Sequence, residues 1–171
     1  MIVDVALLKD GETSFDFQVA PEKIDLEGEA VKLKDAVKIE GNLKNRIAQT
    51  DVQGKISGKI EIECNRCLQA AEMHLEFPFD AVFVTAENYT QEKEAELRAG
   101  DLEVSIFEGD KLDLTELTRE QILLNLPTQV FCREDCQGLC QKCGANLNLI
   151  DCNCEEEKID PRWSALKNLK L

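Results

Sequence analysis

Histidine is almost absent from this sequence, and His74 is the only one among its 171 residues. It falls on the polar face of a predicted strand, so we interpret it as a surface residue. Because acid–base and nucleophilic catalysis usually draw on histidine, a catalytic triad is nearly excluded. The sequence also lacks phosphate-binding loops and dinucleotide-binding glycine motifs. We therefore expect a protein that is not an enzyme and has no small-molecule substrate.

Long apolar runs and a basic leader are missing as well. No hydrophobic stretch approaches the roughly 20 residues that a transmembrane helix needs. The first ten residues carry no cluster of positive charge like that of a signal peptide. We therefore expect a cytoplasmic protein without membrane contact. In that reducing setting thiols stay reduced, which favours metal binding over disulfides.

Positive charge is scarce overall, since the net charge is −14, but it is unevenly distributed. Residues 31–67 hold eight basic and five acidic residues, whereas residues 87–126 hold four basic and eleven acidic residues. An acidic chain does not attract phosphates through its overall field, so the acidic bulk suits a basic protein partner. The basic stretch could still contact RNA, although 5% aromatic residues weaken a base-stacking mode.

Cysteine is plentiful by contrast. Six of the eight cysteines lie between Cys132 and Cys154, and Cys64 and Cys67 form a separate Cys-x-x-Cys pair. Such a turn points two thiolates at one tetrahedral metal, and a glycine directly after Cys143 suits the positive φ at its exit. We predict structural zinc. The candidate ligands are Cys140, Cys143, Cys152, Cys154, Cys132, Cys136, Cys64 and Cys67.

The spacing leaves the grouping of these cysteines open. Cys140 and Cys143 form half of a four-sulfur site, and any two of Cys132, Cys136, Cys152 and Cys154 could complete it. Cys64 and Cys67 could join Cys132 and Cys136 in a second site that uses all eight cysteines. The alternatives are disulfides, an iron–sulfur cluster, or a redox-active Cys64/Cys67 pair in which Arg66 lowers a thiol pKa.

Three long segments alternate between apolar and polar residues. They cover residues 37–47, 50–64 and 73–83, and they predict an antiparallel meander with one solvent-exposed face. Gly54 and Gly58 on the apolar side predict close backbone approach or bulges in a strongly curved sheet. Proline cannot donate to a strand ladder, so Pro78 is expected at an edge or at a strand end.

A helix is predicted over residues 113–126. Asp113 is its expected N-cap, Glu116 completes a capping box, and Leu112 and Leu117 occupy staple positions. Its apolar face is expected to dock on the sheet through Leu114, Leu117, Ile122, Leu123 and Leu124. The helix should end before Pro127, because the residue before proline avoids helical geometry.

The fold class that follows is α+β. We predict a curved antiparallel sheet domain with its docked helix over residues 1–126, and a cysteine-rich zinc-binding tail over residues 127–171. The tail is expected to pack on the same domain and to end in a short helix at 161–169, where an acidic cap precedes Pro161.

Five cations lie on the expected outer faces of two adjacent strands, and a sheet face is a common RNA platform. The predicted RNA-facing residues are Lys38, Lys44, Arg46, Lys55 and Lys59. The alternative is that these side chains only keep the sheet soluble and balance nearby carboxylates.

The run from Cys132 to Asn148, Cys-x-x-x-Cys-x-Gly-Leu-Cys-x-x-Cys-Gly-x-x-Leu-Asn, resembles the C-terminal signature of the YceD family of large ribosomal RNA subunit accumulation proteins. Cys64-Asn-Arg-Cys67, Cys152-Asn-Cys154 and Asp160-Pro-Arg-Trp163 agree with it. The resemblance implies a ribosome biogenesis factor that promotes accumulation of large-subunit (23S) rRNA. Its expected partners are precursor large-subunit rRNA or a basic ribosomal protein. The alternative is a thiol-redox or zinc-responsive regulatory protein in which Cys64 and Cys67 cycle.

Overall fold

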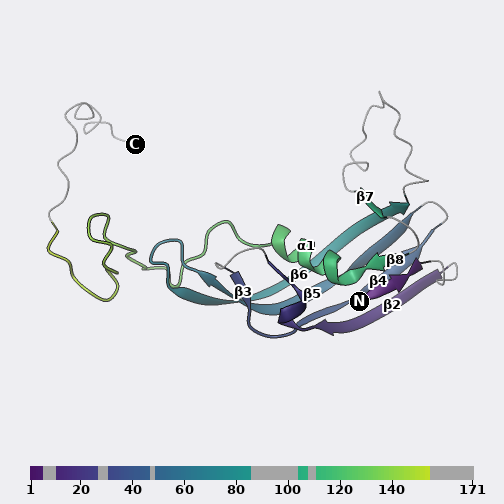
Figure 1. Ribbon diagram of the computed structural model, residues 1–171, viewed down its shortest axis with the longest axis horizontal. Coiled ribbons are helices and arrows are strands. Elements are labelled where there is room, and N and C mark those ends of the chain that lie inside the picture. Colours follow the sequence, from purple (N-terminus) through teal and green to yellow (C-terminus); the bar gives the residue numbers. More distant parts are fainter. Residues whose placement is uncertain (6–10, 27–30, 47–48, 86–103, 108–110, 155–171) are drawn as a thin grey trace, which may run out of the picture.

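The computed structural model describes residues 1–5, 11–26, 31–46, 49–85, 104–107 and 111–154. Figure 1 shows long strands forming one bent sheet, with the helix lying across one face and the cysteine-rich segment running beyond one end. The elements, in chain order, are β1 (Ile2–Asp4), β2 (Gly11–Val19), the short 3₁₀ helix η2 (Pro21–Lys23), β3 (Val31–Leu33), β4 (Val37–Asn45), β5 (Thr50–Glu63), β6 (Ala70–Thr85), β7 (Val104–Phe107), β8 (Lys111–Asp113) and α1 (Leu114–Leu124).

The three long strands form the predicted meander. Strand β5 pairs antiparallel with β4 along one side and with β6 along the whole of the other side. Strand β2 extends the sheet antiparallel beyond β4, and β3 pairs with the far end of β5. The alternating patterns of residues 37–47, 50–64 and 73–83 therefore predicted both the strands and their order.

The prediction of a wholly antiparallel sheet is wrong at one edge. Strand β7 pairs in parallel with the last residues of β6, from Val82↔Val104 to Thr85↔Phe107. Parallel neighbours need a connection of a dozen or more residues, and residues 86–103 make one of that length. Strands β1 and β8 pair with each other in a separate small sheet. The described residues thus form an open, mixed sheet with one α-helix.

The inner face of the sheet and one side of α1 enclose the core. Val37, Val52, Ile56 and Ile60 are fully buried in β4 and β5, and Ile122 of α1 is fully buried too. Each such side chain contributes about 1.5–3 kcal/mol relative to its exposed state. Because side chains alternate along a strand, the same pairing places Lys, Glu and Asp residues on the outer face.

A row of four residues crosses the sheet at its most closely packed point. Phe15 of β2 lies opposite Gly41 of β4, which lies opposite Gly54 of β5, and Gly54 faces Phe79 of β6. A Cβ atom at Gly54 would lie 2.5 Å from the Glu40 carbonyl oxygen and 2.9 Å from the Phe79 ring. The close approach predicted at Gly54 is confirmed, and the two rings cover the space that the glycines leave.

Pro78 lies at an edge, as predicted. It pairs with Lys55 of β5 on one side, and no strand among the described residues pairs with it on the other. Its missing N–H therefore costs no ladder bond there.

Helix α1 begins and ends where the sequence predicts. The Asp113 carboxylate accepts a hydrogen bond from the Thr115 amide at 2.9 Å, and Asn125 ends the helix two residues before Pro127. The buried side includes Leu114, Leu117, Thr118 and Ile122. Leu124 was expected on this side but is 76% exposed, at the last residue of the helix.

Replacing Asp113 by alanine is expected to destabilise the fold by about 1 kcal/mol, since the substitution removes the N-cap acceptor. The melting temperature should fall by about 2–4 °C for a chain of this size. Asp113→Asn is the matched control, because asparagine keeps the cap and loses only the charge that faces the Met1 ammonium group at 3.5 Å. Thermal unfolding followed by circular dichroism should find Asp113→Asn near the parent; equal losses in the two variants would contradict the cap.

The predicted helix at 161–169 and the acidic stretch at 87–100 lie outside the described residues. The division at residue 126 stays a prediction. Within the described ranges, no helix combines the length and the apolar character that spanning a bilayer requires.

Candidate metal centres

The first candidate centre starts at the turn between β5 and β6. The Cys64 amide donates to the Gln69 carbonyl at 2.9 Å, and the Leu68 amide donates to the Cys64 carbonyl at 2.9 Å. Leu68 closes the turn with φ +57°, a conformation that non-glycine residues rarely adopt. The turn buries the side chains of Cys64 and Cys67, which are 0% and 4% exposed. Both thiols therefore face inward at the end of the sheet.

The segment after α1 returns to this turn and is fastened to it by Asn65. The Asn65 amide donates to the Val130 carbonyl at 2.8 Å, and the Val130 amide donates to the Asn65 side-chain oxygen at 2.6 Å. This reciprocal pair fixes the chain two residues before Cys132. Asn65 thus determines where the next cysteine arrives.

Arg66 fastens the same segment further along. Its guanidinium group donates to the Cys136 carbonyl at 3.0 Å and to the Glu134 carbonyl at 3.3 Å. The group also lies over the Phe131 ring, 4.2 Å from its centroid. The two residues between Cys64 and Cys67 therefore hold the segment that carries Cys132 and Cys136.

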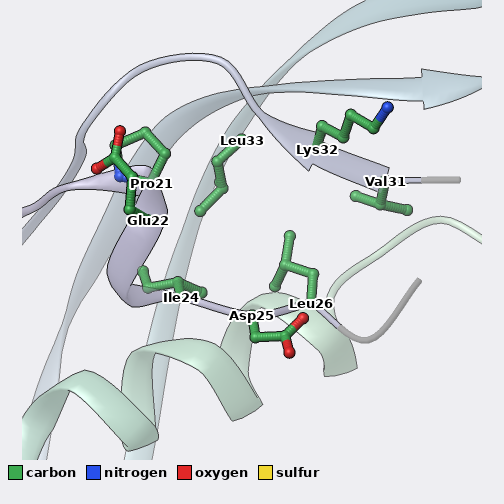
Figure 2. Close-up of a pocket in the computed structure, with 8 residues that line it drawn as sticks. All are labelled: Pro21, Glu22, Ile24, Asp25, Leu26, Val31, Lys32 and Leu33. Atoms are coloured by element: carbon green, nitrogen blue, oxygen red, sulfur yellow. The ribbon is translucent and has the colours of Figure 1, made fainter. Parts of the chain in front are cut away.

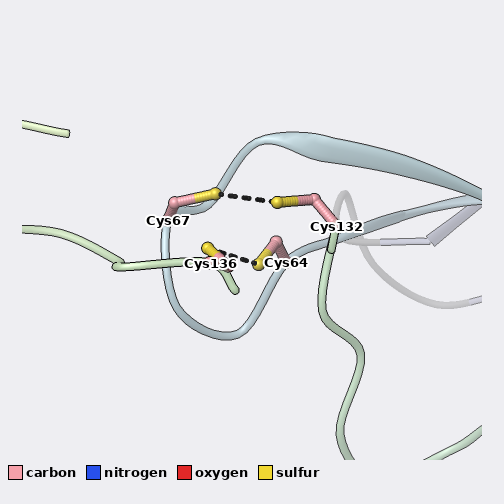
Figure 3. Close-up of side chains that lie close together, drawn as sticks. All are labelled: Cys64, Cys67, Cys132 and Cys136. Carbon is pink, nitrogen blue, oxygen red and sulfur yellow. Dashed lines mark hydrogen bonds between the residues drawn. The ribbon is translucent and has the colours of Figure 1, made fainter. Parts of the chain in front are cut away.

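These contacts gather four thiols, which we call the sheet-anchored cluster (Figure 3): Cys64, Cys67, Cys132 and Cys136. All four sulfur atoms lie within 4.8 Å of one another. Cys64 Sγ lies 3.8 Å from Cys136 Sγ, and Cys67 Sγ lies 3.6 Å from Cys132 Sγ. Four sulfurs at about 2.3 Å from a tetrahedral zinc ion are about 3.8 Å apart. The cluster therefore has the dimensions of a four-sulfur zinc site.

The second group, the tail cluster, lies entirely in the C-terminal segment: Cys140, Cys143, Cys152 and Cys154, again with all sulfurs within 4.8 Å. The Gly144 amide donates to the Cys140 carbonyl at 2.9 Å, and Gly144 has φ +71°, as expected after a Cys-x-x-Cys turn. Cys143 and Cys154 are exposed. Of the groupings that the spacing left open, the structure brings the cysteines together as two clusters of four.

Electrostatics within the sheet-anchored cluster favour a cation. Burial opposes ionisation of Cys64, but the amides of Cys132, Cys67 and Arg66 outweigh it and lower the pKa of Cys64 to about 6. Burial and the neighbouring thiols raise the pKa of Cys132 to about 12. One thiolate forms readily and then prevents its neighbour from ionising, and a divalent cation removes that repulsion.

The tail cluster likewise contains one thiol with a lowered pKa and one with a raised pKa. The amides of Cys143 and Lys142 lower the pKa of Cys140 to about 6, whereas hydrogen bonding with Cys143 and Cys140 raises the pKa of Cys154 to about 12. Backbone amides thus stabilise the first thiolate in each cluster, from the turn itself and, for Cys64, also from Cys132. For Cys64 the backbone N–H of Arg66 has this effect, not its guanidinium charge as the sequence suggested.

The predicted RNA-facing residues lie on the outer face or at its end, and carboxylates accompany them. Four of the five form ion pairs: Lys38 with Asp16 and Glu40, Arg46 with Asp51, Lys55 with Glu76, and Lys59 with Asp35. Lys44 lies opposite Asp51 in the register of β4 and β5. His74 is exposed on the same face, as predicted. These contacts match the alternative in which the cations balance nearby carboxylates.

A hollow of about 350 Å³ lies apart from the cysteines, between η2, β3 and α1 (Figure 2). It is lined by Pro21, Glu22, Ile24, Asp25, Leu26, Val31, Lys32 and Leu33. These side chains include no thiol, imidazole or hydroxyl group. Its charged side chains are Glu22, Asp25 and Lys32, and it contains no thiol.

A family model described as "Large ribosomal RNA subunit accumulation protein YceD" matches residues 52–170, a span that contains all eight cysteines. The chain belongs to the YceD family. This confirms the resemblance seen in the cysteine pattern. No solved structure matches the chain.

Several relatives of this YceD chain are known by sequence. The uncharacterized protein YlbN of Bacillus subtilis is 28% identical over 155 residues, covering 82% of this chain and 85% of its own length. An uncharacterized protein of Mycobacterium tuberculosis is 30% identical over 115 residues, covering 67% of this chain. This YceD chain spans about half, 53%, of that relative. The chloroplastic large ribosomal RNA subunit accumulation protein YCED homolog 1 of Arabidopsis thaliana is 35% identical over 63 residues, 37% of this chain and 20% of its own.

Three residues that support the clusters in this YceD chain were not predicted from its sequence. Asn65 and Arg66 hold Cys132 and Cys136 in place, and Asn148 donates to Cys136 Sγ at 3.4 Å. The usable signal was the position of Asn65 and Arg66 between two cysteines, where side chains lie beside any bound metal. Asn148 ends the Cys132–Asn148 signature, but the spacing gave no sign that its partner would be Cys136 of the other cluster.

Proposed function

We propose that the protein is a non-enzymatic ribosome biogenesis factor that promotes the accumulation or processing of large-subunit (23S) rRNA in the cytoplasm. The observation that carries this proposal is membership of the YceD family over residues 52–170. The name of the Arabidopsis relative, an rRNA accumulation protein, supports it.

We propose zinc as the structural metal of both clusters. The eight thiols form two groups of four, and neither group includes a histidine or a carboxylate. Such all-sulfur groups suit closed tetrahedral sites, which are structural, better than catalytic sites. In the sheet-anchored cluster the metal would join the β5–β6 turn to the segment at 132–136. In the tail cluster it would hold a loop that has little core of its own. Zinc supplies a cross-link in each case, and the protein supplies the orientation.

The charge of the sheet supports a basic ribosomal protein as the direct partner of the outer face. On β2, β4, β5 and β6 this face carries four lysines and nine acidic residues: Glu12, Asp16, Glu40, Asp51, Glu61, Glu63, Glu72, Glu76 and Asp80. Such a face repels phosphates and attracts cationic side chains. Precursor rRNA would then be reached through the ribosomal protein.

Opposite charge reversals separate the two partners. We expect Glu72→Lys, Glu76→Lys and Asp80→Lys together to abolish co-sedimentation of the tagged protein with large-subunit precursors, because they make the β6 side of the face repel a basic protein. The matched variant carries Lys38→Glu, Lys44→Glu and Lys59→Glu, which changes the net charge by the same amount in the opposite sense. It should sediment like the parent.

The measurement is a sucrose gradient of cell lysate, with and without nuclease. If only the variant that replaces Lys38, Lys44 and Lys59 by glutamate loses co-sedimentation, these three lysines contact RNA directly. Exposed ion pairs contribute only about 0–1 kcal/mol, so both variants should fold, and circular dichroism checks this. A parent protein that never sediments with precursors would contradict the ribosomal role.

A thiol-redox or zinc-responsive regulator is the second candidate function. The exposure of Cys143 and Cys154 favours it, since accessible thiols exchange metal and react with oxidants more readily than buried ones. Counting zinc and free thiols per chain before and after mild oxidation tests this candidate. Reversible loss of one zinc with formation of one disulfide supports it, and unchanged zinc and thiol counts exclude it.

A further inference from the structure

The two cysteine clusters share one stretch of chain. Cys136 of the sheet-anchored cluster and Cys140 of the tail cluster are four residues apart, and Gly138 lies between them with φ +78°. A Cβ atom at Gly138 would lie 3.0 Å from the Arg66 carbonyl oxygen, and the Leu139 amide donates to that oxygen at 3.1 Å. The chain between the clusters is thus pressed against the β5–β6 turn.

The loop of the tail cluster is bound back onto this shared stretch. Leu139 and Asn146 form an antiparallel bridge, and the Leu147 amide donates to the Gly138 carbonyl at 2.9 Å. This loop runs from Cys143 to Cys152, so both of its ends are ligands of the tail cluster. Its position is therefore determined by whether those ligands are held together.

Asn148 projects from this loop into the other cluster. Its amide group donates to Cys136 Sγ at 3.4 Å and to the Asn146 side-chain oxygen at 2.8 Å. Its own side-chain oxygen accepts from the Gln137 amide at 2.9 Å and from Arg133 at 2.8 Å. A residue held by the tail cluster thus provides an N–H donor to a sulfur of the sheet-anchored cluster.

We propose that Asn148 is a positioning residue that couples the two clusters, so that metal in the tail cluster raises the metal affinity of the sheet-anchored cluster. The inference rests on the metal binding proposed above. An N–H group directed at a thiolate stabilises the charged form that binds metal, and such supporting contacts are typically worth 10–100-fold in metal affinity. Because coupling between binding sites is reciprocal, metal in the sheet-anchored cluster raises the affinity of the tail cluster by the same factor.

Two substitutions separate coupling from ordinary structural support. Asn148→Asp keeps an oxygen for the Gln137 amide and Arg133 but removes the N–H donor to Cys136. Cys143→Ser breaks the tail cluster without touching any ligand of the sheet-anchored cluster. Asn42→Asp, on the exposed outer face of β4, is the control for the added negative charge.

The full chain is loaded with ¹¹³Cd, and each cluster is followed by its own NMR resonance during competition with a chelator of known affinity. The resonance that survives in Cys143→Ser belongs to the sheet-anchored cluster. We expect Asn148→Asp and Cys143→Ser each to lower cadmium affinity there about tenfold. The double variant should have a cadmium affinity less than about twofold below that of either single variant, because both substitutions remove the same contact. Asn42→Asp should match the parent.

The outcomes are distinct. Cadmium affinity unchanged by Asn148→Asp, or effects of the two substitutions that simply multiply, would overturn the coupling. Asn148→Asp removes no metal ligand, so it decides the question even where Cys143→Ser folds poorly. A parent chain that binds no cadmium at either cluster would overturn the metal role itself.

Discussion

Removing the metal with a chelator is expected to release residues 127–154 from the sheet while strands β4, β5 and β6 stay folded. Hydrogen–deuterium exchange should rise across 127–154 towards the rate of an unfolded chain. Exchange across residues 37–62 should remain at the level of the loaded protein. Mass spectrometry of peptides from each region measures both changes in one sample.

The physical reason is that the cysteine-rich segment has almost no core of its own. The buried group around the sheet-anchored cluster consists of Cys64, Cys67 and Cys136, with Leu139 packed against it. The segment contains one isolated β-bridge and no helix or longer strand within residues 127–154. For small zinc domains the binding free energy, about 10–16 kcal/mol, is also the folding free energy. The sheet has its own apolar core, to which this segment contributes Val130, so we expect the sheet to stay folded without metal.

Single cysteine variants localise the effect. Cys132→Ser removes one ligand of the sheet-anchored cluster, so it should raise exchange from residue 127 onward and at the β5–β6 turn. Cys154→Ser is its matched control in the tail cluster, and its effect should be concentrated in residues 140–154. Chelation that leaves exchange in the segment unchanged would show that hydrogen bonds such as Asn65–Val130 hold it without metal.

Gly54→Ala is expected to destabilise the sheet by about 3 kcal/mol, at the upper end of the usual cost of overpacking. The added methyl group would lie 2.5 Å from the Glu40 carbonyl oxygen, which belongs to the neighbouring backbone and cannot rotate away. Strands β4 and β5 would have to separate, and the Phe79 ring at 2.9 Å would have to move too. The melting temperature should fall by about 6–12 °C.

The same strand provides the control for this substitution. Gly58 lies four residues further along β5 on the same face, and a Cβ atom there would approach only the Val37 side chain, at 3.3 Å. That methyl group can shift by a few tenths of an ångström, so Gly58→Ala should change stability by less than about 1 kcal/mol. Urea unfolding of the two variants measures the difference. Similar losses at both positions would mean that the Phe15–Gly41–Gly54–Phe79 row is not closely packed.

Local patterns predicted the elements well, because local forces determine them. Strict alternation over 50–64 can bury one face only as a strand, and an acidic cap before Leu114 together with Pro127 bounds one helix. The misplaced residue was Leu124, the last residue of the helix, whose side chain is 76% exposed. Periodicity along a helix does not tell at which turn its packed surface ends.

Local sequence patterns sufficed to predict the three central strands, their antiparallel order, the helix boundaries and cysteines at metal-site spacing. Spacing within the chain carries that information, since hairpins and Cys-x-x-Cys turns join near neighbours. The parallel pairing of β7 with β6 and the meeting of Cys64 and Cys67 with Cys132 and Cys136 became known from the three-dimensional arrangement alone. So did the contact of Asn148, from the loop of the tail cluster, with Cys136 Sγ of the sheet-anchored cluster. These contacts join residues 12 to 72 positions apart or strands across a long connection, and their geometry depends on how the bent sheet brings distant segments together.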